Sequence, residues 1–283
     1  MRTPIDPMIN IQMNMSEFNK LSKFIYAHYG INLPIAKKVL LESRLQKHLR
    51  KIGIPSFKKY IEQVCNDQEH EEVVYMINLV STNKTDFFRE KSHFDYMRSI
   101  ILPQAVIEKE REIKIWSAAS SSGEEAYTLA MTMEEFNLQS EHKLHYSIIG
   151  SDISTDVLKT GQMAIYDESR ISTVPIDLKR KYFLRSKDKS HSKVRLIKSI
   201  RDKVKFSRFN LMDERYPTHE SFDIIFCRNV LIYFDKETQE KVVTKLTQCL
   251  KTGGYLFLGH SESIMGMDLP LVQKIHTGYL KTR

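Results

Sequence analysis

The sequence predicts a small helical bundle followed by an α/β domain built on a mainly parallel, doubly wound sheet. Apolar residues recur at helical spacing through the first eighty residues. From about residue 110, short apolar runs alternate with segments of helical periodicity. Such alternation implies parallel strands with helices packed on both faces of the sheet. The length of 283 residues fits one large domain or two unequal ones, here residues 1–80 and 81–283.

Four helices are predicted in the first eighty residues. Ser16 and Ser56 are the expected N-caps of the first and third, because a serine hydroxyl can accept from a backbone N–H at a helix start. Gly30 and Gly53 suit the left-handed position that ends a helix. The predicted helices cover residues 16–29, 35–52, 57–64 and 71–79.

The second predicted helix has a basic face. Arg44, Lys47 and Lys51 are three and four residues apart, so they lie on one side, opposite the leucines of the inner stripe. The formal net charge is +8, and residues 37–59 hold eight Lys or Arg against one acid. Residues 179–208 hold thirteen against two. Each segment is either an ordinary solvated face or a docking site for an acidic partner, nucleic acid or protein.

Residues 81–90 connect the bundle to the α/β part. They combine amide, hydroxyl and guanidinium side chains with two adjacent phenylalanines. Thr85 is predicted to cap a helix that starts in this segment. Arg89 would then lie one turn inside that helix, where its guanidinium can reach back over a ligand pocket.

Six strands and three helices are predicted in the α/β part. Gly253 and Gly254 are expected to end the last of these helices. Ligands of such sheets bind at the carboxyl ends of the strands, near the point where the strand order reverses. The predicted strands cover residues 113–117, 146–150, 204–207, 222–227, 255–259 and 278–281, and the helices cover 124–136, a segment from about 155, and 236–250.

The loop after the first strand, Ser117–Gly123, consists of seven small residues. Small side chains let the backbone approach a ligand at the start of the following helix. A phosphate site would have several glycines and usually a lysine, whereas this loop has one glycine and no lysine. Glu125 instead offers a carboxylate for ribose hydroxyls or an amino group. The loop therefore favours an uncharged or cationic nucleoside, although a plain strand-to-helix turn is equally compatible with it.

Polar residues also follow the next strands. Asp152 ends the second strand and is placed either to accept from a ribose or to cap the next helix. Asn210 and Leu211 follow the third strand, where an amide beside an apolar side chain can frame an adenine. The fourth strand leads into a third polar group, which consists of Arg228, Asn229 and Tyr233.

Bulk properties are those of a cytosolic protein. Three widely spaced cysteines indicate reduced thiols rather than a disulfide framework. No apolar run approaches the roughly 18 residues of a membrane span, and the first residues lack a signal-peptide pattern. His142 and His145 have no third ligand nearby, so no metal site is expected. Cys227 has no evident basic partner and is expected to be a buried thiol.

On these residues the chain resembles the CheR-type chemotaxis receptor methyltransferases over nearly its full length. The resemblance implies an all-helical N-terminal domain and a Rossmann-like domain that uses S-adenosylmethionine as the methyl donor. It also implies a small antiparallel β insert at about residues 185–205. The matching stretches are Thr82–Glu90, Trp116–Tyr127, Gly150–Leu158, Phe222–Asp235 and Gly254–Ser263.

The resemblance implies a reaction and a set of residues. The substrate would be glutamate side chains on the cytoplasmic helical bundle of methyl-accepting chemotaxis receptors, converted to methyl esters, with S-adenosylhomocysteine as the second product. Arg89 and Tyr233 would act at the reacting centre, and residues 81–95 would contribute to the site. The basic face of Arg44, Lys47 and Lys51 would dock the receptor. The implied cofactor contacts are Asn83, Thr85, Arg89, Glu125, Asp152, Asn210, Leu211, Arg228 and Asn229.

Some positions depart from the family pattern, and two other functions stay open. Ser120 stands where the loop often has Cys or Ala, and Ala126 replaces a common proline at the helix start. The insert lacks the glycines of relatives that bind a receptor tail peptide. An RNA methyltransferase would explain the basic segment 179–208, but the sequence carries no RNA-binding module. A non-catalytic sensor of S-adenosylmethionine or S-adenosylhomocysteine is the other alternative. We expect a cytoplasmic monomer that neither inserts into a membrane nor binds nucleic acid.

Overall fold

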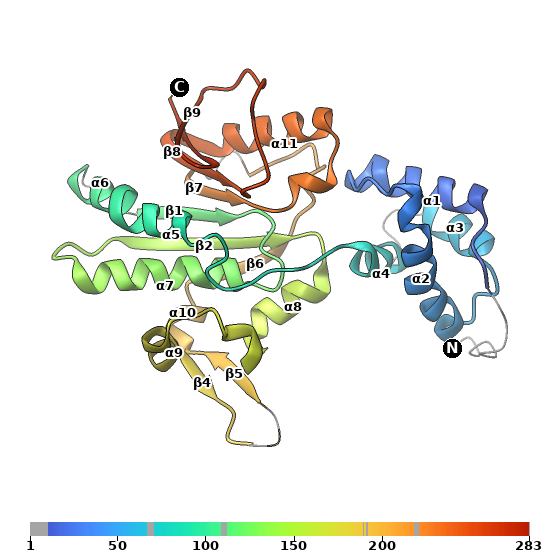
Figure 1. Cartoon of the computed structure of the whole chain (residues 1–283), viewed down its shortest axis with the longest axis horizontal. Helices are drawn as coiled ribbons and strands as arrows, with labels where there is room; N and C mark the ends of the chain where they lie inside the picture. Colours follow the sequence, from blue (N-terminus) through green and yellow to red (C-terminus); the bar gives the residue numbers. More distant parts are fainter. Residues whose placement is uncertain are drawn as a thin grey trace. The chain divides into compact units, whose positions relative to one another are not determined.

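The computed structural model describes residues 11–66, 71–108, 112–188, 190, 192–217 and 221–282. The chain divides into two compact units (Figure 1). One unit ends at Thr82 and also takes in Tyr233–Asp235, and the other holds Asn83–Ile232 and the chain from Lys236 onward. No helix in these residues is both long enough and apolar enough to span a membrane.

The regular elements in the described residues of the first unit are all helices, as predicted. Gly30 and Gly53 adopt φ values of 69° and 71° and end their helices in the left-handed conformation. Ser56 Oγ accepts from the N–H of Lys59 at 3.3 Å, so the predicted cap is confirmed. The helices are α1 (Met15–Tyr29), η1 (Ile35–Lys37), α2 (Lys38–Ile52), α3 (Phe57–Asn66) and α4 (Glu71–Val80).

The predicted cap of the first helix is wrong. Asn14, not Ser16, is the N-cap: its side chain accepts from the N–H of Glu17, and the Glu17 carboxylate accepts from the N–H of Asn14. Two backbone donors at the helix start are satisfied in this reciprocal arrangement, whereas a serine cap alone satisfies one. Ser16 therefore lies inside the first turn.

The second unit is built on a seven-stranded sheet. Its strand order is β6-β2-β1-β7-β8-β10-β9. The first five of these pair in parallel, and β10 runs antiparallel to both β8 and β9. The mainly parallel sheet is confirmed, although β9 was not predicted. The strands are β1 (Glu112–Ser117), β2 (His145–Asp152), β6 (Val204–Arg208), β7 (Phe222–Cys227), β8 (Leu250–Leu258), β9 (Leu271–Ile275) and β10 (Gly278–Lys281).

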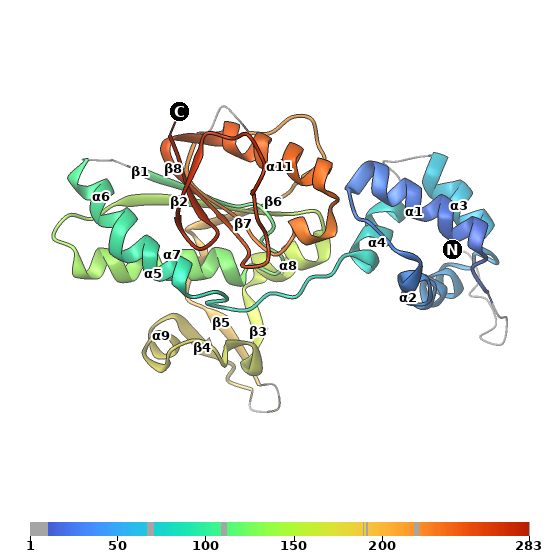
Figure 2. The ribbon, with the colours of Figure 1, turned by 45° about the horizontal axis from the view of Figure 1, so that its top comes forward.

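Helices cover both faces of this sheet. Along β7, Ile224 and Phe226 join the core formed with α7 (Glu124–Gln139), and the alternation of a strand turns Ile225 and Cys227 to the opposite face. In two views, α11 (Lys236–Cys249) lies across the sheet from α7 (Figures 1 and 2). Helix α8 (Thr155–Met163) follows β2. The carboxyl ends of the parallel strands therefore meet at one edge.

The connecting segment differs from its prediction. No helix starts at Thr85, because the chain forms a turn over residues 87–91 and α5 (Ser92–Tyr96) begins afterwards. Phe88 and Glu90 have φ values of 56° and 54°, which a right-handed helix excludes. The chain continues through η2 (Met97–Ile101) and α6 (Leu102–Ile107).

The small antiparallel sheet is confirmed, but its predicted range is wrong. It has three strands in the order β3-β5-β4 (Figure 2). Its first strand, β3, begins at Ile165, well before residue 185. Two short helices, η3 (Glu168–Ile171) and α9 (Ile176–Tyr182), separate β3 from β4. Lys189 and His191, in the predicted insert, lie outside the described residues. The strands are β3 (Ile165–Asp167), β4 (Phe183–Arg185) and β5 (Lys193–Leu196), and α10 (Lys198–Arg201) leads from them into β6.

The ring of Phe206 on β6 lies in a space left by three glycines. A Cβ on Gly150 would lie 2.7 Å and 2.8 Å from two atoms of this ring, and a Cβ on Gly123 would lie 2.9 Å from a third. A Cβ on Gly161, in α8, would lie 3.0 Å from two atoms of the ring. The absence of these side chains lets the loop before α7, the strand β2 and the helix α8 approach one another.

We predict that Gly150→Ala lowers the free energy of unfolding of the second unit by about 1–3 kcal/mol, because the added methyl overpacks against Phe206. In a Phe206→Val background the same change should cost clearly less, since valine lacks both clashing atoms. Urea unfolding followed by the fluorescence of Trp116, the single tryptophan, measures this. An equal cost in both backgrounds would show that another neighbour limits the space at Gly150.

Candidate active site

The small-residue loop is fixed against the neighbouring strand. The N–H of Ser120 donates to the carbonyl of Ser151 at 2.8 Å, and the N–H of Ser121 donates to Asp152 Oδ2 at 2.9 Å. Gly123 then adopts a φ of 94° directly before α7. Asp152 thus ends β2, and its carboxylate also holds the backbone of the loop that leads into α7.

Two carboxylates flank this loop, of which Asp152 is buried and Glu125 is largely buried. Ser117 Oγ donates to Glu125 Oε1 at 2.7 Å, and the N–H of Ser154 donates to Asp152 Oδ1 at 2.9 Å. Burial raises the pKa of both carboxyl groups. The charge of Arg228 acts to lower the pKa of Glu125, and backbone N–H donors act to lower that of Asp152, but burial prevails in both. An ionised carboxylate has about four acceptor positions, so each retains some for a ligand. Ser154, not Asp152, is the N-cap residue of α8.

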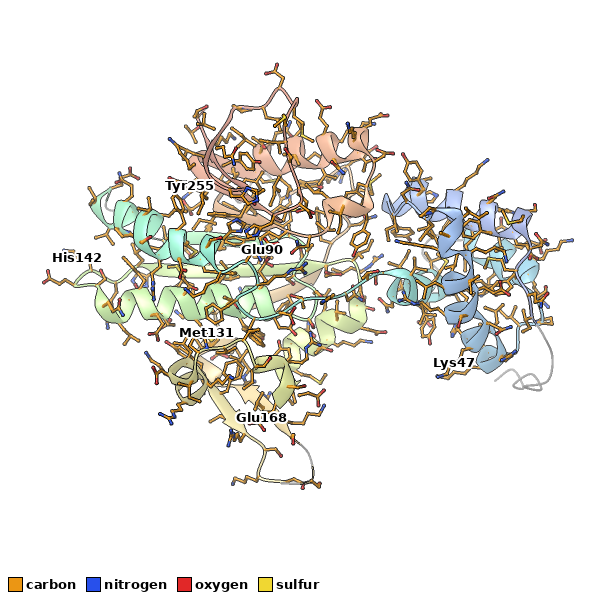
Figure 3. The ribbon with its side chains drawn as sticks, viewed as in Figure 1. Lys47, Glu90, Met131, His142, Glu168 and Tyr255 are labelled. Atoms are coloured by element: carbon orange, nitrogen blue, oxygen red, sulfur yellow. The ribbon has the colours of Figure 1, made fainter. Side chains whose placement is uncertain are left out.

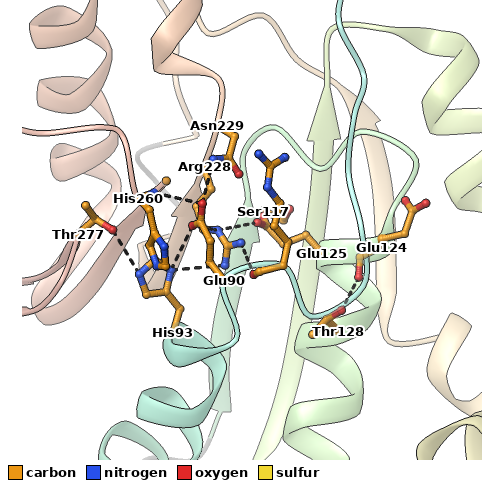
Figure 4. Close-up of polar contacts among 12 residues, drawn as sticks. Glu90, His93, Ser117, Glu124, Glu125, Thr128, Arg228, Asn229, His260 and Thr277 are labelled. Carbon is orange, nitrogen blue, oxygen red and sulfur yellow. Dashed lines mark hydrogen bonds and ion pairs between the residues drawn. The ribbon is translucent and has the colours of Figure 1, made fainter. Parts of the chain in front are cut away.

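Arg228 is the centre of the site. Its side chain is 1% exposed, and its Nε lies 3.4 Å from Glu90 Oε2 and 3.3 Å from Glu125 Oε2. Nη2 donates to the carbonyl of Arg89. The guanidinium also lies over the ring of Phe94, at 5.3 Å from its centroid. Figure 4 shows both carboxylates meeting this one cation.

His93 completes the surroundings of Arg228 and is fully buried. Its Nε2 lies 2.9 Å from the carbonyl of His276 and must donate to it, so Nδ1 is the acceptor facing Arg228 Nη1 at 3.4 Å. Burial, helped by the charge of Arg228, lowers the pKa of His93 to about 4. The imidazole is therefore neutral at pH 7.

Glu90 joins segments that are distant in sequence. Its Oε1 accepts from Asn229 Nδ2 at 3.0 Å and from the N–H of His260 at 3.2 Å. Glu90, His93 and His260 bring ligand-type atoms within 4.8 Å of one another. However, the guanidinium of Arg228 faces His93 Nδ1, where it opposes a second cation. The geometry therefore favours a hydrogen-bonded cluster around Glu90 over a metal site.

Glu262, which follows β8, and Cys227, the last residue of β7, have structural roles. Glu262 is buried, and its carboxylate accepts from the N–H groups of Asn229 at 2.9 Å and Leu231 at 2.8 Å. It therefore holds the turn that follows β7. Cys227 is fully buried, and burial raises the pKa of its thiol well above the usual value. A protonated, buried thiol is not a nucleophile.

Other residues of the predicted site lie around this centre. The carbonyl of Asn83 accepts from Ser121 Oγ at 3.2 Å, and the carbonyl of Thr85 accepts from Arg170 Nη2 at 3.4 Å. Arg89 Nη1 donates to the carbonyl of Lys84 at 3.1 Å. Asn210 and Leu211 directly follow Phe209, whose N–H donates to the carbonyl of Asp152 at 3.0 Å.

Four predicted residues belong to the helical unit. Tyr233 groups with that unit, and Lys37 Nζ lies 5.5 Å from its ring centroid. Arg44 is half-buried, and its Nη1 donates to the carbonyl of Leu79 at 2.7 Å, at the end of α4. Lys47 is exposed and points outward from α2 (Figure 3), and Lys51 is exposed as well.

Sequence reasoning missed four residues of the site. Glu90 was read only as part of a motif, and His93 was not singled out. Glu124 is buried and forms an ion pair with Arg170, which also donates to Ser122 Oγ at 3.2 Å. The pattern offered no signal for these contacts, because each joins segments that are separated in sequence.

The neutral His93 predicts a pH dependence of stability. Its pKa is about 4 in the folded state and about 6.5 in an unfolded chain, so the folded state binds fewer protons between these values. The stability that the neutral His93 contributes to the folded state is therefore complete above pH 6.5, and it is lost as the pH falls toward 4. We predict that His93→Gln reduces the slope of unfolding free energy against pH in this window, by at most about 1.4 kcal/mol per pH unit.

Urea unfolding at several pH values, read from Trp116 fluorescence, measures this slope. His142→Gln is the control, because His142 is exposed and its replacement should leave the slope unchanged. An unchanged slope in His93→Gln would mean that other groups cause the acid sensitivity.

Comparison with known proteins agrees with this arrangement. The family model of the CheR methyltransferase all-alpha domain matches residues 16–81, and that of the CheR methyltransferase SAM binding domain matches residues 83–277. The chain is 40% identical to a chemotaxis protein methyltransferase of Borreliella burgdorferi, over 91% of this chain and 92% of that protein. It is 34% identical to that of Salmonella typhimurium (91% and 87%) and 32% identical to that of Escherichia coli (95% and 92%). The chain therefore belongs to the CheR methyltransferase family.

Proposed function

We propose that this S-adenosylmethionine-dependent methyltransferase esterifies glutamate side chains on the cytoplasmic helical bundle of chemotaxis receptors. The relatives named above are chemotaxis protein methyltransferases, and they match the chain over most of its length. The observation that carries the proposal is the ion-paired group of Glu90, Arg228 and Glu125, which is largely shielded from solvent beside the small-residue loop. We assign the reaction to the cytoplasm, where these receptor glutamates would lie.

The residues around the loop suit the cofactor. Glu125 and Asp152 retain acceptor positions for ribose hydroxyls and an ammonium group, and small side chains leave room beside them. Asn210 and Leu211 follow β6 next to Asp152, where we propose that they frame the adenine. The full set of proposed cofactor contacts is Asn83, Thr85, Arg89, Glu125, Asp152, Asn210, Leu211, Arg228 and Asn229.

The proposed chemistry needs little acid–base help. S-adenosylmethionine supplies an electrophilic methyl group, and a glutamate carboxylate is already ionised at neutral pH. The protein must therefore align the two groups and remove water from the attacking oxygen. We assign this positioning to Arg89, whose guanidinium can bind a carboxylate, and to the hydroxyl of Tyr233.

The basic segment 179–208 gives little support to RNA as a substrate. Several of its cations are already neutralised by acids of the same unit. Lys181 pairs with Glu135 at 2.5 Å, and Lys193 pairs with Asp167 at 2.7 Å. Arg185 and Lys198 form further pairs, with Glu168 and Asp202. The free positive charge that would bind phosphates is correspondingly reduced.

The proposed function predicts a specific product. Incubation with methyl-labelled S-adenosylmethionine and receptor cytoplasmic domains should give label that alkali releases as methanol, because a glutamate methyl ester is base-labile. The doubly substituted Arg89→Ala/Tyr233→Phe protein should show a kcat at least tenfold lower, since alignment at the reacting centre is lost.

Other outcomes would point elsewhere. Label on RNA would support the RNA methyltransferase, and cofactor binding without transfer to any receptor domain would support a sensor. An unchanged kcat in the doubly substituted protein would remove Arg89 and Tyr233 from the mechanism while leaving the substrate intact.

The basic face of α2 is the proposed receptor-docking surface. Arg44 also binds the end of α4, so its replacement would disturb the fold. Lys47 and Lys51 are exposed and suit a cleaner test. We predict that Lys47→Glu/Lys51→Glu raises the KM for the receptor at least tenfold and leaves cofactor affinity unchanged, because the reversed charges repel an acidic partner.

The matched control is Lys58→Glu/Lys59→Glu, which makes the same charge change at exposed positions of α3. Steady-state kinetics at two salt concentrations compares the variants, and the KM difference should shrink at high salt. Equal KM increases in both variants would indicate a general charge effect in place of a docking surface.

A further inference from the structure

The turn that carries Arg89 has an unusual backbone. The residues on either side of it, Phe88 and Glu90, both adopt positive φ values. Each such residue costs of order 1–3 kcal/mol and persists only where surrounding contacts impose it. The structure must therefore contain contacts that hold this turn.

Three elements of the same unit hold it. The N–H of Phe88 donates to Thr128 Oγ1 on α7 at 3.2 Å. The carbonyl of Arg89 accepts from Arg228, at the end of β7. Glu90 makes the remaining contacts: its carboxylate accepts from Asn229 Nδ2 and from the N–H of His260, after β8.

The Glu90 side chain is well placed for this role. It is 11% exposed, and its Oε2 faces Arg228 Nε at 3.4 Å and His93 Nδ1 at 3.9 Å. Burial tends to raise the pKa of Glu90, but the hydrogen bond from Asn229 and the charge of Arg228 prevail and lower it. The carboxylate is thus ionised at neutral pH, with Oε1 held by two hydrogen bonds and Oε2 facing Arg228.

We infer that Glu90 is a positioning residue: it fastens the strained turn to the ends of β7 and β8 and so fixes the guanidinium of Arg89 at the methyl-transfer site. This inference rests on the proposed function, because it takes the role of Arg89 from there. Glu90 itself touches neither substrate nor cofactor in this scheme. Its effect passes through the backbone of its neighbour.

A second consequence follows from the shared cation. The charged groups around Glu125 are Arg228, Glu90 and Arg89. Burial raises the pKa of Glu125 most, Arg228 opposes this, and the negative charge of Glu90 raises it further. Removing that charge should lower the pKa of Glu125. Glu125 would then stay ionised, and able to accept from the cofactor, at more acidic pH.

The test is a double-mutant cycle of Glu90→Gln with Arg89→Ala. Glutamine keeps an oxygen that can accept from Asn229 and His260 but removes the charge facing Arg228. We expect Glu90→Gln to lower kcat at least tenfold and to weaken S-adenosylhomocysteine binding a few-fold. In the Arg89→Ala background the same change should alter either quantity less than twofold, because the group that Glu90 positions is gone.

The pH profile gives a readout that a merely structural role would not move. The dissociation constant for S-adenosylhomocysteine should rise as the pH falls through the pKa of Glu125, and in Glu90→Gln this rise should begin at lower pH. Glu135→Gln is the control: Glu135 is 19% exposed, pairs with Lys181 and lies in the same unit. It should leave kcat within twofold and the profile unchanged.

Two results would overturn the inference. One is a Glu90→Gln substitution that lowers kcat and S-adenosylhomocysteine affinity equally in the presence and absence of Arg89. The other is an Arg89→Ala protein with normal kcat and normal cofactor affinity. If the wild-type protein transfers no methyl group to receptors, the proposed function fails, and the cycle is then read on S-adenosylhomocysteine affinity alone. The two failures are therefore distinguishable.

Discussion

The buried guanidinium of Arg228 is the interaction on which the rest of the site depends. Removing such a cation from water costs several kcal/mol, and only close anions and acceptors offset this cost. Glu90 and Glu125 supply the charge, and the carbonyl of Arg89 and the neutral imidazole of His93 supply further acceptors. The first turn of α7, the turn before α5 and the end of β7 thus meet at one cation. Loss of Arg228 would leave the carboxylates of Glu90 and Glu125 without the cation that lies between them.

Local signals in the sequence predicted much of the fold. Gly30 and Gly53 marked the ends of two helices because a left-handed residue ends a helix whatever surrounds it. The parallel strands were found because their apolar runs are bounded by turn residues. Asp152 and Arg228 were placed at strand ends by the same reasoning, and the structure has them there.

Contacts between distant segments could not be predicted in this way. The sequence around Thr85 does not predict the positive φ values of Phe88 and Glu90. The residues that impose this conformation lie on α7 and after β7 and β8. The β insert was placed too late because its first strand is separated from the others by two short helices. The sequence also gives no reason to single out His93, because its partners His276 and Arg228 are distant along the chain.

These distant contacts also constrain how the chain folds. Glu90 reaches a residue 139 positions later, and His93 reaches one 184 positions later. The ends of these long loops meet only after β7, β8 and β10 have paired, and closing them costs chain entropy that local helices do not pay. During synthesis nearly the whole chain must leave the ribosome before Glu90 and His93 find their partners. The active centre is therefore among the last parts of the molecule to form, although its first residues are made early.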